Sequence, residues 1–180
     1  MPFAYYERLT RAQQRVYRQS DEVTSLRLPG AALLRPLIAL LEAALRSEER
    51  TRVETAAQRV FTGLTRAFGV TACRVEVLAA RPHGRWGELQ GLYTTAPSGR
   101  LPKVTLWMRT ARQRRVVAFR TFLRTLLHEL GHHLDYEHLR LSDSFHTEGF
   151  YKRESSLFHQ LVPPSPETGE AEDTPPSAAG

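Results

Sequence analysis

The chain contains a single cysteine, Cys73, and this scarcity excludes several classes of protein. One thiol cannot form an intramolecular disulfide, and a structural zinc site built from several cysteines is excluded as well. We expect Cys73 to be a small buried residue at the start of a strand rather than a catalytic thiol.

Long hydrophobic runs are also absent. The longest, residues 31–45, is interrupted by Arg35, Pro36 and Glu42, so the sequence predicts no membrane span. No stretch resembles a signal peptide. We therefore expect a soluble, cytoplasmic protein with no membrane partner, and the sequence favours no particular oligomeric state. A length of 180 residues suits one domain with a substantial core.

Lysine is scarce too, because only Lys103 and Lys152 accompany 23 arginines. The net charge is +6, and residues 163–180 carry four acidic residues and no Lys or Arg, so the rest of the chain is more basic than the total indicates. A basic surface attracts nucleic acid, acidic proteins or anionic lipid. A general preference for arginine over lysine explains the same composition without any such partner.

The hydrophobic pattern predicts an α+β fold. Helical spacing over 4–19, 31–45 and 50–68 predicts an N-terminal helical region, residues 1–70. Alternating stretches at 72–78, 88–95 and 104–108 predict three short strands, followed by a long helix and a C-terminal helix over 150–161. We expect residues 71–162 to form a core that makes one compact domain with 1–70. Residues 163–180, rich in Pro, Ser and Glu, predict a disordered tail.

Residues 128–133 read HELGHH, and this motif carries the clearest chemistry in the chain. On a helix, residues four apart lie one turn apart on nearly the same face. His128 and His132 can therefore direct two imidazoles at one metal ion. The Glu129 carboxylate lies one step round the helix, where it can reach a water on that metal. Two neutral nitrogens beside a base predict a zinc hydrolase in which Glu129 is the catalytic base.

The surroundings of the motif support this interpretation. Apolar residues recur at helical spacing from Val117 to Leu134, and no proline interrupts residues 114–140. Six of the seven histidines fall between residues 128 and 159, which a merely solvated surface helix does not explain. His133 is turned about 100° from His132 on the helix, so we expect it and His138 to point elsewhere.

A catalytic zinc ion takes three protein ligands and keeps one position for water, so a third ligand is needed. His146 lies 14 residues after His132, which is enough chain to turn and bring a second element back. Glu154 lies inside the predicted C-terminal helix and is an alternative third ligand. Asp135, three residues past His132, is a candidate for an outer carboxylate that orients an imidazole.

The letters TLLHELGH at 125–132, followed by HxxGF at 146–150, resemble the SprT-like group of zincin metallopeptidases. In that group a helical HExxH motif is followed, after a short insertion, by a histidine, a glycine and an aromatic residue that open another helix. The resemblance covers about residues 85–162. It implies that the two motif histidines and His146 bind zinc and that Glu129 is the base.

Two features depart from this resemblance. Many members have glycine directly after the third histidine, where this chain has Thr147, and no Cys-rich ribbon is present to imply the nucleic-acid attachments of some members. A second resemblance competes with the first. The letters RESSLF at 153–158 resemble the segment with the glutamate ligand in gluzincins, including small peptidases similar to the ImmA/IrrE group, and imply Glu154 as the third ligand.

The order of three short strands before the metal helix recurs in small zincins, in which the strand nearest the helix can pair with an extended substrate. We expect residues 103–109 to be that edge strand. The predicted reaction is hydrolysis of a peptide bond in a protein or peptide substrate, with a Zn²⁺ cofactor. Hydrolysis also needs a group that stabilises the oxyanion. Tyr136, Tyr151 and Arg153 are candidates by their proximity in sequence alone.

Two other functions remain open at the level of sequence. The first is a nucleic-acid-associated protein with a zinc site, which recruits proteolysis to protein on DNA. Its evidence is an arginine cluster beside Trp107, comprising Arg109, Arg112, Arg114, Arg115, Arg120 and Arg124. The second is a non-catalytic domain stabilised by zinc, against which the intact glutamate argues, because a structural zinc ion needs no base.

Overall fold

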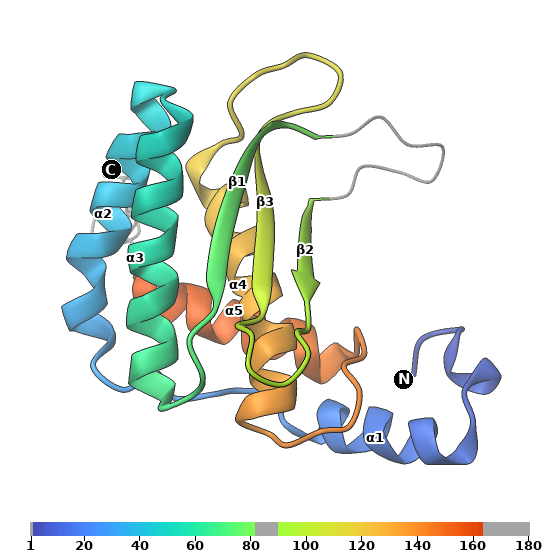
Figure 1. Cartoon of the computed structure of the whole chain (residues 1–180). Helices are drawn as coiled ribbons and strands as arrows, with labels where there is room; N and C mark the ends of the chain where they lie inside the picture. The colour runs from blue at the N-terminus through green and yellow to red at the C-terminus, as the bar shows by residue number, and fades with distance from the viewer. Residues whose placement is uncertain (1, 82–89, 164–180) are drawn as a thin grey trace, which may run out of the picture.

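The structure is a computed structural model that describes residues 2–81 and 90–163, and it confirms the α+β class. Five α-helices and a three-stranded sheet make up the described chain (Figure 1). In order, the elements are a short 3-10 helix (Tyr6–Arg8), α1 (Arg11–Glu22), α2 (Ala31–Ser47), α3 (Arg50–Phe68), β1 (Arg74–Ala80), β2 (Gly91–Thr94), β3 (Lys103–Arg109), α4 (Phe119–Glu137) and α5 (Glu148–Leu161). Over the described ranges, none of the helices is long and apolar enough to cross a membrane.

The helices surround the sheet on several sides. α2 and α3 pack on each other, α3 lies against β1, and α4 packs behind β2 and β3 (Figure 1). α5 contacts α4, α2 and α1, so the N-terminal helices and the C-terminal part of the chain share one core. The predicted boundary at residue 70 therefore separates sequence regions that pack together. Fully buried side chains from both regions include Leu41, Phe61, Leu64, Leu106, Leu126 and Phe158.

The sheet corrects one prediction. Its strand order is β1-β3-β2, with β1 parallel and β2 antiparallel to β3. Residues 103–109, predicted as the edge strand, are therefore the central strand. All five inner residues, 104–108, are buried, as expected for a strand covered on both faces. The edge strand beside α4 is β2, which corresponds to the described part of the strand predicted over 88–95.

Side chains of α3 occupy the opposite edge of the sheet. The Val77 N–H donates to Glu54 Oε2 at 2.9 Å, and the Val75 N–H donates to Gln58 Oε1 at 2.8 Å. Arg50 donates to the Val77 carbonyl oxygen at 2.9 Å. These bonds satisfy main-chain groups that an edge strand otherwise leaves open. The other end of the sheet, at β2, lies beside α4.

Helix boundaries follow from local capping. α3 spans residues 50–68 as predicted and ends at Gly69, whose φ of 64° is the left-handed conformation that glycine adopts readily. The helix predicted over 4–19 instead begins at Arg11, because Thr10 and Gln13 form a reciprocal capping box. It continues through Glu22. The tail predicted over 163–180 lies outside the described residues except for Pro163.

Candidate metal centre

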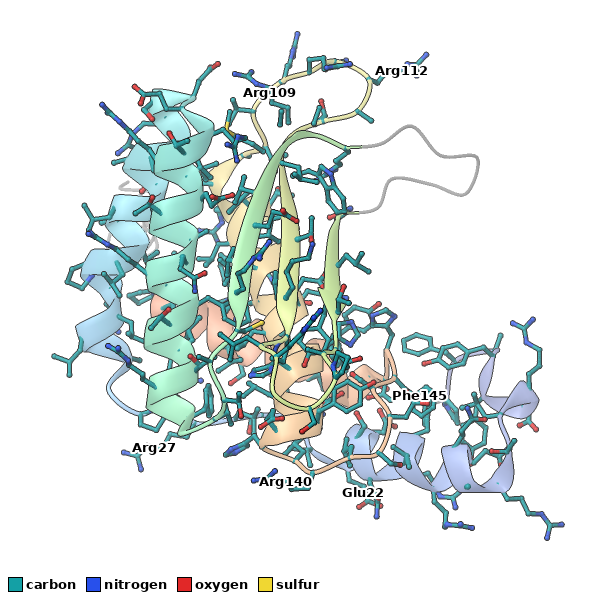
Figure 2. All side chains as sticks on the ribbon, viewed as in Figure 1. Glu22, Arg27, Arg109, Arg112, Arg140 and Phe145 are labelled. Carbon is teal, nitrogen blue, oxygen red and sulfur yellow. The ribbon has the colours of Figure 1, made fainter. Side chains whose placement is uncertain are left out.

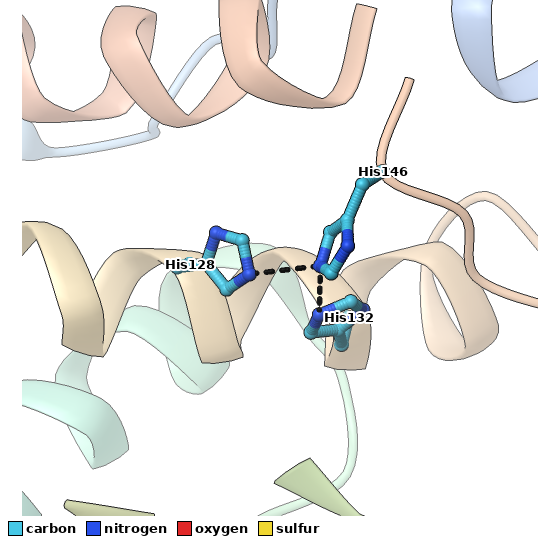
Figure 3. A group of neighbouring side chains, drawn as sticks. All are labelled: His128, His132 and His146. Carbon is cyan, nitrogen blue, oxygen red and sulfur yellow. Dashed lines mark hydrogen bonds between the residues drawn. The ribbon is translucent and has the colours of Figure 1, made fainter. Parts of the chain in front are cut away.

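Three histidines converge beside the middle of α4. His128 and His132 lie one turn apart on α4, and His146 comes from the segment that links α4 to α5 (Figure 3). The Nε2 atom of His146 lies 2.9 Å from Nε2 of His128 and 3.1 Å from Nε2 of His132. All three ligand atoms fall within 4.8 Å of one another. The structure therefore brings together the three residues that the SprT-like resemblance implies.

The outer nitrogens of the two α4 histidines both have hydrogen-bond acceptors. His128 Nδ1 lies 3.1 Å from Glu154 Oε2. His132 Nδ1 lies 2.7 Å from Ser144 Oγ, whose own proton goes to Asp135 Oδ2 at 2.8 Å. These partners place a proton on Nδ1 of each ring and leave each Nε2 with a free lone pair. This tautomer is the one that binds a metal through Nε2.

Burial favours the neutral form of His132 and His146, which is the form that metal ligands require. The pKa of His132 is lowered to about 3, first by burial and then by the neighbouring His128 and His146. Burial is also the main cause that lowers the pKa of His146. A single proton on His146 Nε2 can bridge only one of its two close nitrogen neighbours. A cation bound by all three Nε2 atoms would satisfy both close nitrogen–nitrogen contacts at once.

The donor set fits zinc. Tetrahedral zinc with Zn–N bonds of about 2.0–2.1 Å holds its nitrogen ligands about 3.3–3.4 Å apart. The two Nε2 distances at His146 are 2.9 Å and 3.1 Å, close to this spacing. Imidazole nitrogens also suit other transition metals, and the preference for zinc comes from the HExxH pattern.

Glu154 lies in the outer position rather than among the converging nitrogens. Its carboxylate contacts His128 on Nδ1, the ring nitrogen that faces away from His146. Its other oxygen, Oε1, lies 3.7 Å from Arg124. The geometry thus favours His146 as the third ligand and gives Glu154 the role of a carboxylate that orients His128.

Asp135 orients His132 through Ser144, and a buried ion pair holds Asp135 in turn. The side chains of Asp135 and Arg153 are 0% and 4% exposed, and their closest contact is 2.8 Å. Burial raises the pKa of the Asp135 carboxyl, while Arg153 and Ser144 act in the opposite direction. Arg153 also donates to the main-chain oxygens of Ser20 and Val23. The outer support of His132 therefore reaches back to α1.

This position removes Arg153 from the three oxyanion candidates that proximity in sequence suggested. Its guanidinium is enclosed between α4 and α1 and takes no part in lining the cavity beside the histidines. From the sequence alone, an arginine next to a motif is expected to be exposed, because burying its guanidinium costs free energy unless several acceptors surround it. Here Asp135, Ser20 and Val23 supply those acceptors.

Replacing Arg153 with methionine is expected to lower the free energy of unfolding by about 3–5 kcal/mol, because Asp135 would remain buried without its partner. Zinc affinity should fall about 10–100-fold as well, since Ser144 loses a fixed acceptor. Urea unfolding and a zinc competition titration measure the two effects. Lys152→Met is the matched control, because Lys152 is an exposed neighbour paired with Glu148. Equal, small effects of both substitutions would contradict this account.

Glu129 lies buried between α4 and the edge strand, with 4% of its surface exposed. Burial is the main cause that raises its pKa to about 7, while His128 and the Tyr93 N–H act to lower it. A Cβ atom at Gly91 would lie 2.4 Å from Glu129 Oε1, so glycine is required for β2 to approach this carboxylate. A carboxylate with this pKa can both accept and return a proton near neutral pH.

A cavity of about 1110 Å³ connects the histidines to the edge strand. Its lining includes β2 on one side and the exposed face of α4 on the other. Tyr136 and Tyr151, two predicted oxyanion candidates, line this cavity, and burial raises the pKa of both phenols. They therefore offer neutral O–H donors at the histidine cluster. A separate cavity of about 460 Å³ between α2 and α3 contains no histidine.

His133, His138 and Cys73 make packing or hydrogen-bond contacts outside the histidine cluster. His133 is fully buried, with Nε2 2.8 Å from the Thr71 oxygen and Nδ1 3.0 Å from the Tyr93 hydroxyl. His138 packs against the Phe68 ring, so both histidines point away from the cluster as predicted. Cys73 is buried and its pKa is raised to about 12 by burial, which suits a packing residue.

The predicted arginine cluster is divided between the end of β3 with the connection that follows it and the first half of α4. Arg109, at the end of β3 (Figure 2), donates to Glu48 at 2.8 Å and to the Arg114 carbonyl at 3.1 Å. Arg112 lies on the loop above it (Figure 2). Arg120 and Arg124 instead pack over the Phe158 ring on α5. Trp107 is buried in β3 and is unavailable to stack on a base.

Sequence reasoning missed Ser144 and two close approaches. Gly131 admits the Phe150 ring, whose nearest atom would be 2.8 Å from a Cβ at that position. Gly149 admits the Asp21 main chain, whose oxygen would be 2.3 Å from a Cβ. The Gly-Phe pair after His146 belongs to the letters that resemble the SprT-like group. Gly149 lets α5 approach α1 at Asp21, and Phe150 packs against Gly131 and the three histidine rings.

Comparison with other proteins adds no relative. No protein-family model matches the chain, and neither a curated protein nor a solved structure is detectably similar to it. The class of the site therefore rests on its own residues and geometry.

Proposed function

We propose that this protein is a zinc-dependent metallopeptidase. The observation that carries the proposal is the convergence of three histidine nitrogens beside a buried glutamate, at a cavity bounded by a sheet edge. The order of these residues, and their resemblance to SprT-like zincins, support the same class. The Glu129 carboxylate, buried beside the histidines and against Gly91, favours a catalytic site over a structural one, because a structural zinc site needs no base beside the metal.

Each residue has a role in the proposed reaction. His128, His132 and His146 would hold the zinc ion, which supplies an activated water and polarises the substrate carbonyl. Glu129 accepts the proton of that water and returns it to the leaving amine. Tyr136 or Tyr151 donates a hydrogen bond to the developing oxyanion. A cytoplasmic location remains a prediction from the sequence.

The substrate is proposed to bind as an added strand along β2. This strand ends the sheet beside the cavity, whereas main-chain groups of β1 at the opposite edge are bonded to α3. An extended peptide can pair with such an edge through main-chain hydrogen bonds, and an antiparallel pair is slightly more stable than a parallel one. Because the contacts are to main chain, this mode alone selects an extended conformation rather than a sequence.

Metal removal tests the proposal. Protein purified without added metal and then offered zinc is expected to retain about one equivalent per chain. It should cleave a mixture of unstructured peptides, read out by mass spectrometry, and lose this activity with a chelator and regain it with zinc. His128→Ala protein prepared in parallel controls for contaminating peptidases. Folded protein that retains no zinc would refute the site, and cleavage that survives chelation would refute the mechanism.

A further inference from the structure

The direction of β2 relative to α4 fixes the direction of a bound peptide. Gly91 faces Glu129, whereas Tyr93, two residues later, contacts His133 and Tyr136. Both elements therefore advance in the same direction, as Figure 1 also shows. A peptide antiparallel to β2 runs opposite to α4. The residues after its scissile bond then lie over the first half of α4, before His128.

Arg124 lines the cavity at this end. It lies one turn before His128 on α4, and its side chain is 40% exposed. The guanidinium carbon lies 4.1 Å from the centre of the Phe158 ring, and this cation–π contact holds the side chain against α5. A guanidinium in this position is oriented before any ligand arrives, so little side-chain entropy is lost on binding.

The charge of Arg124 is only partly matched. Its contact with Glu154 is 3.7 Å, too long for a hydrogen bond, and the other oxygen of Glu154 contacts His128. Arg120 approaches the same Phe158 ring at 4.8 Å and adds positive charge nearby. The first half of α4 therefore presents a positioned cation to the cavity, with donors that can bind an anion.

Resting on the proposed peptidase function, we propose that Arg124 binds a substrate carboxylate on the C-terminal side of the scissile bond. One helical turn is about 5.4 Å and an extended peptide advances about 3.3 Å per residue, so this carboxylate lies about two residues beyond the cleaved bond. It is supplied either by an acidic side chain or by the free C-terminus of the substrate. The protein thereby prefers acidic segments or chain ends over neutral internal segments.

Binding to zinc-loaded Glu129→Gln protein tests this subsite without cleavage. The probes are short peptides of one neutral sequence: one blocked at both ends, one with a free C-terminal carboxylate, and a blocked series with a single glutamate at successive positions. We expect a carboxylate at one position to tighten binding about tenfold or more relative to the fully blocked peptide. The free-terminus peptide and the glutamate series distinguish the two sources of that carboxylate.

The matched variants are Arg124→Gln and Arg120→Gln, each made in the Glu129→Gln protein. Arg124→Gln should remove the preference for the carboxylate while zinc content and binding of the blocked peptide stay unchanged. Arg120→Gln, outside the cavity lining, should keep most of the preference. Equal affinity for all peptides, unaffected by either variant, would overturn the subsite and leave the peptidase proposal standing. Failure to bind any peptide with zinc present would overturn both.

Discussion

Glu129→Gln is expected to leave zinc bound and to reduce peptide hydrolysis by about 10²–10⁴-fold. Glutamine has the same shape and can still accept the hydrogen bond from the Tyr93 N–H, so β2 keeps its close approach at Gly91. It cannot accept a proton from water. The loss should appear in kcat, measured on a peptide identified as a substrate, with zinc content measured on the same sample.

Glu137→Gln is the matched control for this substitution. Glu137 lies on the same helix, accepts a hydrogen bond from the Thr71 hydroxyl at 2.9 Å and is outside the cavity lining. Its replacement should leave kcat within about threefold of the wild-type value, because it touches no reacting group. Full activity in Glu129→Gln protein that contains zinc would exclude Glu129 as the base.

His146→Ala is expected to weaken zinc binding more than any substitution in the outer positions. Removing a ligand leaves two nitrogens, whereas Glu154→Gln removes only the carboxylate that orients His128 and should cost about 10–100-fold in affinity. The two variants separate the ligand sets implied by the two resemblances. A competition titration with a chromogenic chelator measures both affinities under one set of conditions.

His138→Ala supplies the control for loss of an imidazole, because His138 lies on the far side of the cluster against Phe68. It should bind zinc as the wild type does. The reverse ranking, with Glu154→Gln losing zinc and His146→Ala retaining it, would make Glu154 the third ligand. Glu154 would then have to leave its position beside His128 Nδ1 when the metal binds.

Local features of the site were predictable because they depend on helix geometry alone. The spacing of His128 and His132 places both rings on one face of any helix, and the hydrophobic pattern predicted that helix. His146 was predicted as the third ligand from its spacing after His132 and from the family resemblance together. Its selection over Glu154 required the direction of each imidazole, which is set by Ser144, Asp135 and Glu154 across separate elements.

Non-local pairings were the part that the sequence did not determine. A run of apolar residues such as 104–108 fits either a central strand or an edge strand that packs on a helix, and only the placement of β2 beside β3 distinguishes them. The burial of Arg153 was likewise not predictable from the sequence. Its partners, Ser20 and Asp135, lie 133 and 18 residues away in the sequence.

The bonds from α3 to β1 also bear on how copies of this protein avoid joining into larger sheets. Unpaired strand edges are the sites at which β-sheets of different molecules grow into aggregates. At β1 the side chains of Glu54 and Gln58 already hold the main-chain donors. β2, at the other edge, spans only Gly91–Thr94. Such a short edge favours the docking of one extended peptide beside the cavity over pairing with the folded sheet of another molecule.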